Sequence, residues 1–321
     1  MSIRFRKGAV MNIVFMGTGS FGVPCLETLV RSGHTIRCAV SQPDKPRDRG
    51  MRVEPTAVKR AASSLGLTVY QPDDINSGAS VEYIKGLRPD VLVVIAYGQR
   101  LSQAILDIPS MMPVNIHASL LPAYRGAAPV NWALIRGERT TGVTLMKIVL
   151  RMDAGPVILQ KPLAILDTDT ALTLSEKLSF LAADVLDQGI RLLCGPGLRL
   201  TEQDEPAATY APKLTKSDGS IDWNKPACEI VNRVRGCVPW PGAFTLYRGR
   251  SVKIHSATVL PDAAVRPGAA GQVIGLSRQG IAVSAGAGAV LVTSLQMEGK
   301  RVVSADEFIA GYRVRDIDRF G

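Results

Sequence analysis

The first half of the chain alternates short apolar runs with segments in which apolar residues recur every three or four positions. The runs "NIVFMG" (12–17), "TIRCAV" (35–40), "DVLVVIAYG" (90–98) and "MPVNIH" (112–117) have the length of strands. The stretches 20–33, 55–66 and 171–195 have the spacing of amphipathic helices. Nearly continuous apolar strands that alternate with helices are typical of a parallel sheet covered on both faces. The pattern therefore predicts an α/β domain built on a parallel sheet.

The second half of the chain has a different texture. Residues 196–213 combine prolines, mixed charge and weak periodicity, which is typical of a linker. Beyond Ile221, short strand-like runs separated by glycine-bearing turns predict a small barrel or sandwich. We therefore expect a flexible extension at 1–10, one domain at 11–195, the linker at 196–213 and a β domain at 214–321.

Composition narrows the classes of protein. The 321 residues carry a formal net charge of +10, which fits attraction to a polyanion such as nucleic acid, although charge alone also fits a solubility feature of the source proteome. The 5 cysteines form no C-x-x-C pair and are odd in number, so neither a zinc site nor a disulfide framework is indicated, and a cytoplasmic location is expected. No apolar run reaches the roughly 20 residues that span a bilayer, so no membrane association is expected.

Residues 17–22 read "GTGSFG" and fit the dinucleotide-binding pattern G-x-G-x-x-G. That pattern needs an acidic residue near the end of the second strand to hold the ribose. Here Ser41 and Gln42 follow the strand, and the first carboxylate is Asp44 in the next loop. We therefore interpret the glycines as a requirement of tight strand-to-helix packing, and we expect no NAD.

One of the chain's 3 histidines ends a predicted strand. Asn115 lies two residues before His117, so strand alternation places both side chains on one face. An amide can hydrogen-bond a developing oxyanion, and an imidazole moves protons near neutral pH. Asp153, in "RMDAGPVI" after another apolar strand, can return beside His117 and orient its ring. Taken alone, the pair fits a structural histidine equally well.

The stretch "NIHASLLPAYRGAAPVNWALIRGERTTGVTLMKI", followed by "MDAGPVI", resembles the folate-dependent formyltransferase family. "FMGTGSFGVPCLETL", "SQPDKPRDRG" and "LQMEGKRVVSADEFIAG" extend the resemblance over nearly the whole chain. Asn115, His117 and Asp153 match the family's catalytic trio position by position. The resemblance implies a Rossmann-like formyltransferase domain that uses 10-formyltetrahydrofolate as co-substrate, without a metal. It also implies that the folate pterin packs near Ser119, Leu120, Leu121 and Pro122.

Within this family the chain is most similar to the enzymes that formylate methionine on initiator Met-tRNA for translation initiation. The resemblance then implies a monomer whose C-terminal domain is an OB-like β-barrel that binds tRNA. The loop after the second strand is expected to approach the acceptor stem through Lys45, Arg47, Arg49 and Arg52. Basic residues of the second domain are expected to extend that contact: Arg233, Arg235, Arg248, Arg250, Lys253, Arg313 and Arg315.

The chain departs from the family pattern in two loops. Before Asp153 the family usually reads "MDEGLDTGP", whereas this chain has "IVLRMDAGP", with Val149 and Leu150 at the acidic pair and Arg151 at a glycine. In the basic loop, Lys45 stands at the usual arginine, and a lysine lacks the planar fork of a guanidinium.

Two other functions fit part of this pattern. A folate-dependent formyltransferase acting on a small amine, such as an amino sugar nucleotide, would share the trio but would not need the C-terminal barrel or the basic surplus. A nucleic-acid-binding module with a catalytically dead first domain would not need the intact trio.

Overall fold

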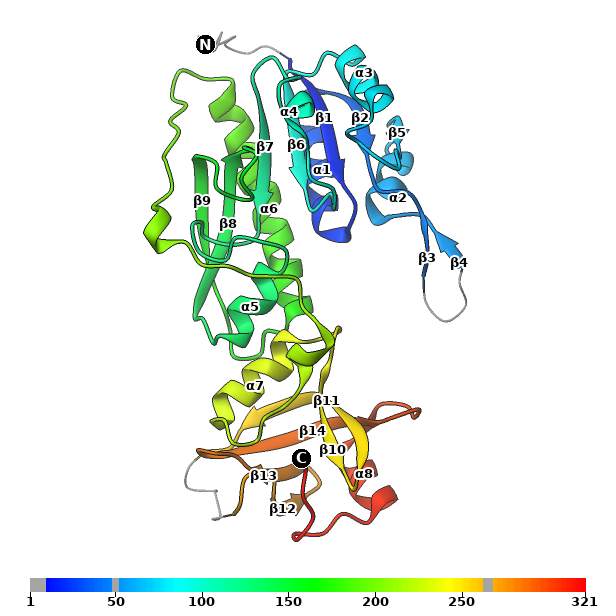
Figure 1. The fold of residues 1–321 in the computed structure, drawn as a ribbon, viewed down its shortest axis with the longest axis vertical. Helices are drawn as coiled ribbons and strands as arrows, with labels where there is room; N and C mark the ends of the chain where they lie inside the picture. Colours follow the sequence, from blue (N-terminus) through cyan, green and yellow to red (C-terminus); the bar gives the residue numbers. More distant parts are fainter. Residues whose placement is uncertain (1–9, 48–51, 262–267) are drawn as a thin grey trace. The chain divides into compact units, whose positions relative to one another are not determined.

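The computed structural model describes residues 10–47, 52–261 and 268–321 (Figure 1). Contacts divide the chain into two compact units: Met1–Gly126 with Thr140–Ala164 and Ser175–Tyr210, and Ala127–Arg139 with Ile165–Leu174 and Ala211–Gly321. This division groups residues 127–139 and 165–174 with the second unit, although the sequence assigns 11–195 to one domain. The predicted domain boundaries stay a prediction. The extension expected at 1–10 lies, apart from Val10, outside the described residues.

The first unit is built on a mixed, mostly parallel sheet. Its strands lie in the order β5 (Val69–Tyr70), β2 (Thr35–Val40), β1 (Asn12–Gly17), β6 (Val91–Ile95), β7 (Met112–His117), β8 (Thr140–Lys147) and β9 (Val157–Ala164). The strands from β5 to β7 are parallel, as the apolar pattern predicts, whereas β8 and β9 pair antiparallel. The order reverses direction between β1 and β6, and ligands of such sheets bind outside the carboxyl ends of the strands at that point.

Helices cover the sheet with their apolar positions. They are α1 (Val23–Arg31), α2 (Ala57–Ser64), α3 (Gly78–Gly86), α4 (Gln103–Leu106) and α6 (Ala171–Leu193), with a 3-10 turn η1 (Ser20–Gly22) before α1 (Figure 1). In α1, Cys25, Leu26 and Leu29 are buried, as the helical spacing predicts. In α6, Leu178, Leu186 and Ile190 are buried. A side chain at Gly189 of α6 would collide with Leu145 of β8, so this helix packs closely on the sheet.

The basic loop after β2 forms a two-stranded antiparallel ribbon of β3 (Lys45–Arg47) and β4 (Arg52–Glu54), which the sequence did not predict (Figure 1). Its base is fixed by Asp44, which forms an ion pair with Lys59 and accepts a hydrogen bond from Gln71 at 2.7 Å. A 2.6 Å hydrogen bond between the hydroxyls of Ser41 and Thr56 adds to this anchor. The ribbon therefore starts from a rigid part of the first unit.

The second unit contains the antiparallel β domain expected from the sequence. Its strands are β10 (Ala243–Tyr247), β11 (Arg250–Val259), β14 (Ala289–Met297), β13 (Gly280–Ser284) and β12 (Val273–Ser277) in spatial order, with β15 (Val303–Ser304) paired to β14. Helices α5 (Pro129–Ile135), α7 (Ala227–Gly236) and α8 (Ala305–Tyr312) belong to this unit, as does η3 (Lys216–Gly219), whereas η2 (Glu205–Ala207) lies in the first. Trp223, Phe308 and Phe320 are buried in its core.

Within the part of the chain that the structure describes, no helix combines the length and apolar character that crossing a membrane requires.

Candidate active site

Asn115 and His117 stand at the carboxyl end of β7, where parallel strands present ligands. His117 is 6% exposed, and Asn115 is half-buried. Asn115 pairs in register with Val94 of β6 and Met146 of β8, so it lies on a central strand rather than on an edge strand of the sheet. Among the described residues its side-chain amide makes no hydrogen bond, which leaves it available to a ligand.

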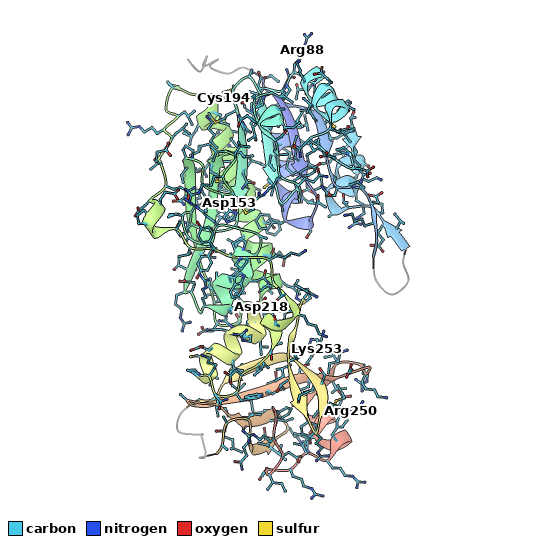
Figure 2. The ribbon with its side chains drawn as sticks, in the orientation of Figure 1. Arg88, Asp153, Cys194, Asp218, Arg250 and Lys253 are labelled. Carbon is cyan, nitrogen blue, oxygen red and sulfur yellow. The ribbon has the colours of Figure 1, made fainter. Side chains whose placement is uncertain are left out.

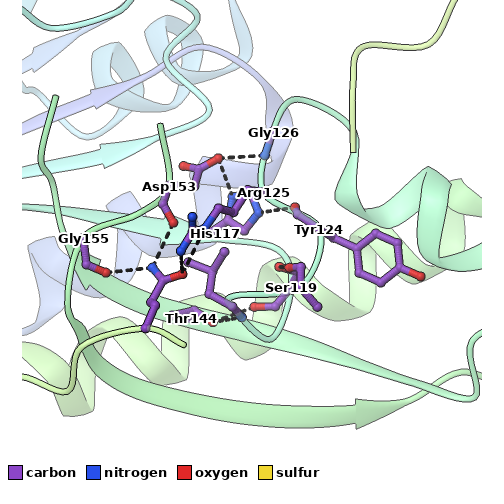
Figure 3. Close-up of polar contacts among 11 residues, drawn as sticks. His117, Ser119, Tyr124, Arg125, Gly126, Thr144, Asp153 and Gly155 are labelled. Atoms are coloured by element: carbon purple, nitrogen blue, oxygen red, sulfur yellow. Dashed lines mark hydrogen bonds and ion pairs between the residues drawn. The ribbon is translucent and has the colours of Figure 1, made fainter. Parts of the chain in front are cut away.

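The structure brings Asp153 beside His117, as the sequence predicts. The Asp153 Oδ2 atom lies 3.7 Å from Nδ1 of His117, and the same oxygen accepts a 2.9 Å hydrogen bond from the amide of Gly126 (Figure 3). Asp153 has φ +50, in the left-handed region that an aspartate tolerates better than most residues. Figure 2 shows it at the other end of the sheet from Arg88 and Cys194.

The His117 ring is fixed from its second nitrogen as well. Nε2 lies 2.8 Å from the carbonyl oxygen of Tyr124, and because a carbonyl only accepts, Nε2 carries a proton (Figure 3). The imidazole therefore lies between a carbonyl, which receives its Nε2 proton, and a carboxylate, which faces Nδ1.

A buried arginine supports both loops of the site. The side chain of Arg125 is 1% exposed, and it donates to Glu205 at 2.8 and 3.1 Å and to Oε1 of Gln203 at 2.8 and 3.1 Å. The second partner of Glu205 is Arg151, at 2.7 Å. The guanidinium of Arg125 holds the pKa of the Glu205 carboxyl below its usual value, and Arg151 adds to this effect. Sequence reasoning missed Gln203 and Glu205, because they lie in a stretch whose pattern indicates only a linker.

The stretch expected to contact the pterin is largely engaged within the protein. Ser119 and Leu121 are buried, and the Ser119 hydroxyl donates to Ala123 O at 2.6 Å. Leu120 is half-buried, and a side chain at Gly142 would collide with it, so it packs over β8. Pro122 is half-buried as well. The role of this stretch in binding the pterin stays a prediction.

Only part of the glycine turn has the packing role expected of it, because a Cβ at Gly19 would meet nothing within 4 Å. A Cβ at Gly17 would lie 3.0 Å from the carbonyl oxygen of Ile95 and 2.9 Å from the ring of Phe15. Asp44, the first carboxylate after β2, is held by Lys59 and Gln71 rather than directed to a ribose site.

The predicted basic residues differ in their surroundings. Lys45 is exposed at the start of the ribbon, Arg49 lies outside the described residues, and only the backbone of Arg47 and Arg52 is described. In the second unit, Arg250 and Lys253 are exposed on β11 (Figure 2).

Three other arginines of the second unit have protein partners and are less available to a polyanion. Arg235 of α7 donates to the carbonyls of residues 166, 167 and 169, Arg233 donates to Asp218 O at 2.5 Å, and Arg248 pairs with Asp318 at 2.8 Å.

Tyr97, just beyond β6, carries a buried hydroxyl without a hydrogen-bond partner among the described residues. We expect Tyr97→Phe to raise the free energy of unfolding by about 1 kcal/mol, because an unpaired buried polar group is removed. Burial raises the pKa of Tyr97 from 10.0 to about 12. Because the folded state resists ionisation of Tyr97, this group leaves the free energy of unfolding unchanged below pH ~10 and lowers it as the pH rises through ~12. Denaturant unfolding between pH 8 and 12 should therefore show a flatter alkaline loss in the variant, and an unchanged curve would contradict this assignment.

The comparisons with known proteins agree with this geometry. The formyl transferase family model matches residues 11–190, and the model of the formyl transferase C-terminal domain matches residues 213–313. The chain belongs to the formyl transferase family, whose members are folate-dependent.

Two full-length relatives are both named methionyl-tRNA formyltransferase. The protein from Geobacter sulfurreducens is 40% identical over 98% of each chain, and the protein from Moorella thermoacetica is 42% identical over 94% of this chain and 96% of its own. Among solved structures, HypX from Aquifex aeolicus in complex with tetrahydrofolic acid is similar, with a TM-score of 0.65 and 17% identity over 95% of this chain and 48% of HypX. That likeness supports the fold alone.

Proposed function

We propose that this protein transfers the formyl group of 10-formyltetrahydrofolate to the α-amino group of methionine esterified to initiator tRNA. The observation that carries the proposal is the approach of His117 and Asp153 to 3.7 Å at the carboxyl edge of the sheet, beside the unengaged amide of Asn115. The full-length relatives with the name methionyl-tRNA formyltransferase support the choice of acceptor.

The reaction requires no covalent enzyme intermediate. The α-amino group has a pKa near ~8, so part of it is neutral at physiological pH and attacks the formyl carbon. Negative charge then develops on the formyl oxygen. When the tetrahedral adduct collapses, the bond between the formyl carbon and the folate nitrogen breaks, and that nitrogen takes up the proton that the attacking amine loses. Asn115 donates a hydrogen bond to this oxygen. Protonated His117 donates the second, and Asp153 stabilises its charge.

The Nε2 proton of His117 is bonded to Tyr124 in the structure. To reach the formyl oxygen, the imidazole must share or exchange that bond. Hydrogen bonds of this kind often tighten only when substrate is present. The folate pterin then packs beside the half-buried Leu120 and Pro122.

The direct test is incubation with 10-formyltetrahydrofolate and Met-tRNA, with formyl-Met-tRNA as the measured product. Uncharged tRNA serves as the control, and a parallel reaction contains a nucleotide-linked amino sugar. Formylation of the sugar without formylation of Met-tRNA would replace the proposal by the small-amine alternative. Sedimentation of the active protein tests the monomeric state that belongs to the same proposal, and its substrates imply a cytoplasmic location.

The β3–β4 ribbon is the proposed contact with the acceptor stem. Arg47 and Arg52 are paired in register across the two strands. The ribbon thus brings several basic residues into a short segment, and such a segment attracts a polyanion. Tetrahydrofolate offers few anionic groups, whereas the phosphates of tRNA provide many along one surface.

Lys45→Ala is expected to weaken tRNA binding severalfold and to reduce the slope of log affinity against log salt by about 1, because one phosphate contact is removed. Binding of Met-tRNA is measured over a range of salt concentrations. Lys85→Ala, at an exposed position of α3, is the matched control and should leave the slope unchanged. Equal slopes for Lys45→Ala and the unmodified protein would exclude Lys45 from the interface.

A further inference from the structure

The stretch between Thr201 and Thr209, which we name the strap, touches both loops of the candidate site. Thr201 exchanges two backbone hydrogen bonds with Val157, at 2.8 and 2.9 Å, just after the Asp153 loop. Thr209 accepts from the amides of Tyr124 and Arg125, each at 2.9 Å, in the loop after His117. The strap therefore spans the distance between the elements that carry the two halves of the site.

Gln203 is the part of the strap closest to the chemistry. Its Nε2 donates to the carbonyl oxygen of Asp153 at 2.8 Å and to that of Gly155 at 2.7 Å. Its Oε1 accepts two hydrogen bonds from the buried Arg125. Each end of this amide can make only one kind of contact, because the nitrogen donates and the oxygen accepts. The side chain thus joins the Asp153 loop to the His117 loop through a single planar group.

The contacts of Gln203 stabilise an unfavourable backbone conformation at Asp153. A positive φ at a residue with a side chain costs free energy and persists only where the surroundings hold it. Gln203 binds the carbonyls on both sides of Ala154, and Gly126 binds the carboxylate from the other direction. These bonds fix the direction in which the Asp153 carboxylate meets His117.

Glu205 links the same two loops through ion pairs. It binds Arg125 from the His117 loop and Arg151 from the Asp153 loop. Arg151 belongs to the Asp153 loop, so this second ion pair ties that loop to the strap as well. Both side chains of the Arg151 pair are well exposed, and we assign its effect to loop position rather than to global stability.

We propose that Gln203 is a positioning residue for formyl transfer: its amide holds the Asp153 loop so that the carboxylate orients His117. This inference rests on the proposed function. It requires that loss of Gln203 slow formyl transfer because Asp153 is displaced. The affinity for tRNA should stay unchanged.

The test compares Gln203→Ala and Gln203→Glu with Glu202→Gln, an exposed neighbour used as the control. The glutamate variant keeps the size of the side chain and the acceptor for Arg125, but it cannot donate to the two carbonyls. We expect both Gln203 variants to lower kcat by about tenfold with KM for Met-tRNA within twofold, since a small displacement of a reacting group is costly. The control should retain kcat.

Adding Gln203→Ala to the Asp153→Asn variant tests whether Gln203 acts through Asp153. Gln203→Ala should lower the single-turnover rate of Asp153→Asn by less than about twofold, because the residue through which it acts is already altered. Amide hydrogen exchange at Gly126 should become faster in Gln203→Ala and stay unchanged in Glu202→Gln.

The outcomes separate this inference from the proposed function. If the unmodified protein does not formylate Met-tRNA, the proposed function fails. If it does, a kcat near normal in both Gln203 variants overturns the positioning role. The positioning role is also overturned if Gln203→Ala lowers the single-turnover rate of Asp153→Asn by a full tenfold. The same holds if the Gln203 variants change only the KM for Met-tRNA. Unfolding of both variants, seen in thermal melts, would assign Gln203 to folding and overturn the inference as well.

Discussion

His117→Ala is expected to lower the turnover of Met-tRNA formylation by on the order of 10²–10³, equivalent to about 3–4 kcal/mol of activation free energy. The imidazole is the only histidine ring within reach of Asp153 among the described residues, and in the proposed mechanism it donates a hydrogen bond to the developing oxyanion. Asn115→Ala removes the second donor and should cause a loss of the same order. Single-turnover rates with saturating 10-formyltetrahydrofolate measure both effects.

His34→Ala is the matched control for these variants. His34 accepts a 3.3 Å hydrogen bond from the amide of Met11 at the start of the sheet, far along the strands from the site. It should keep turnover within about twofold. Thermal melts must show all three variants folded. A His117→Ala protein that retains most of its turnover would remove the imidazole from the mechanism and leave Asn115 as the principal donor.

Gly155→Ala is expected to reduce turnover on the order of 10²-fold and to destabilise the protein by about 2–3 kcal/mol. A Cβ at this position would overlap the carbonyl oxygen of Lys147, a backbone atom that cannot turn away as a side chain does. The loop must therefore move, which displaces the Gly155 carbonyl from Gln203 and the Asp153 carboxylate from His117. Denaturant unfolding and single-turnover kinetics measure the two effects separately.

Gly86→Ala is the control for the cost of adding a methyl group. Gly86 is the last residue of α3, and a Cβ there meets open space. Its unfolding free energy should change by less than about 1 kcal/mol, with normal turnover. If Gly155→Ala matches this control in both measurements, the loop tolerates displacement and the geometry of Asp153 does not limit the reaction.

The parts of the fold that the sequence predicts are those with a strong local period. The runs that form β1, β2, β6 and β7, and the apolar face of α6, are visible because burial selects apolar residues at fixed spacing. The β3–β4 ribbon was missed, since a charged three-residue strand has little apolar pattern. Helix α7 was missed although Ala227, Ile230 and Val234 have helical spacing, because this region was interpreted as strands alone. The antiparallel direction of β8 and β9 was missed because periodicity carries no information on which way a strand is paired.

The sequence by itself determined which chemical groups are present and the family to which they belong. Asn115 and His117 share a face because strand geometry alternates, and the motif around Asp153 is read from local residues. Only the tertiary structure decided that Asp153 meets His117, that Arg125 is buried, and that Gln203 reaches a carbonyl 50 positions away along the chain. Such contacts depend on how distant segments return to one another, and that is fixed by the packing of the whole sheet rather than by the neighbours of any residue.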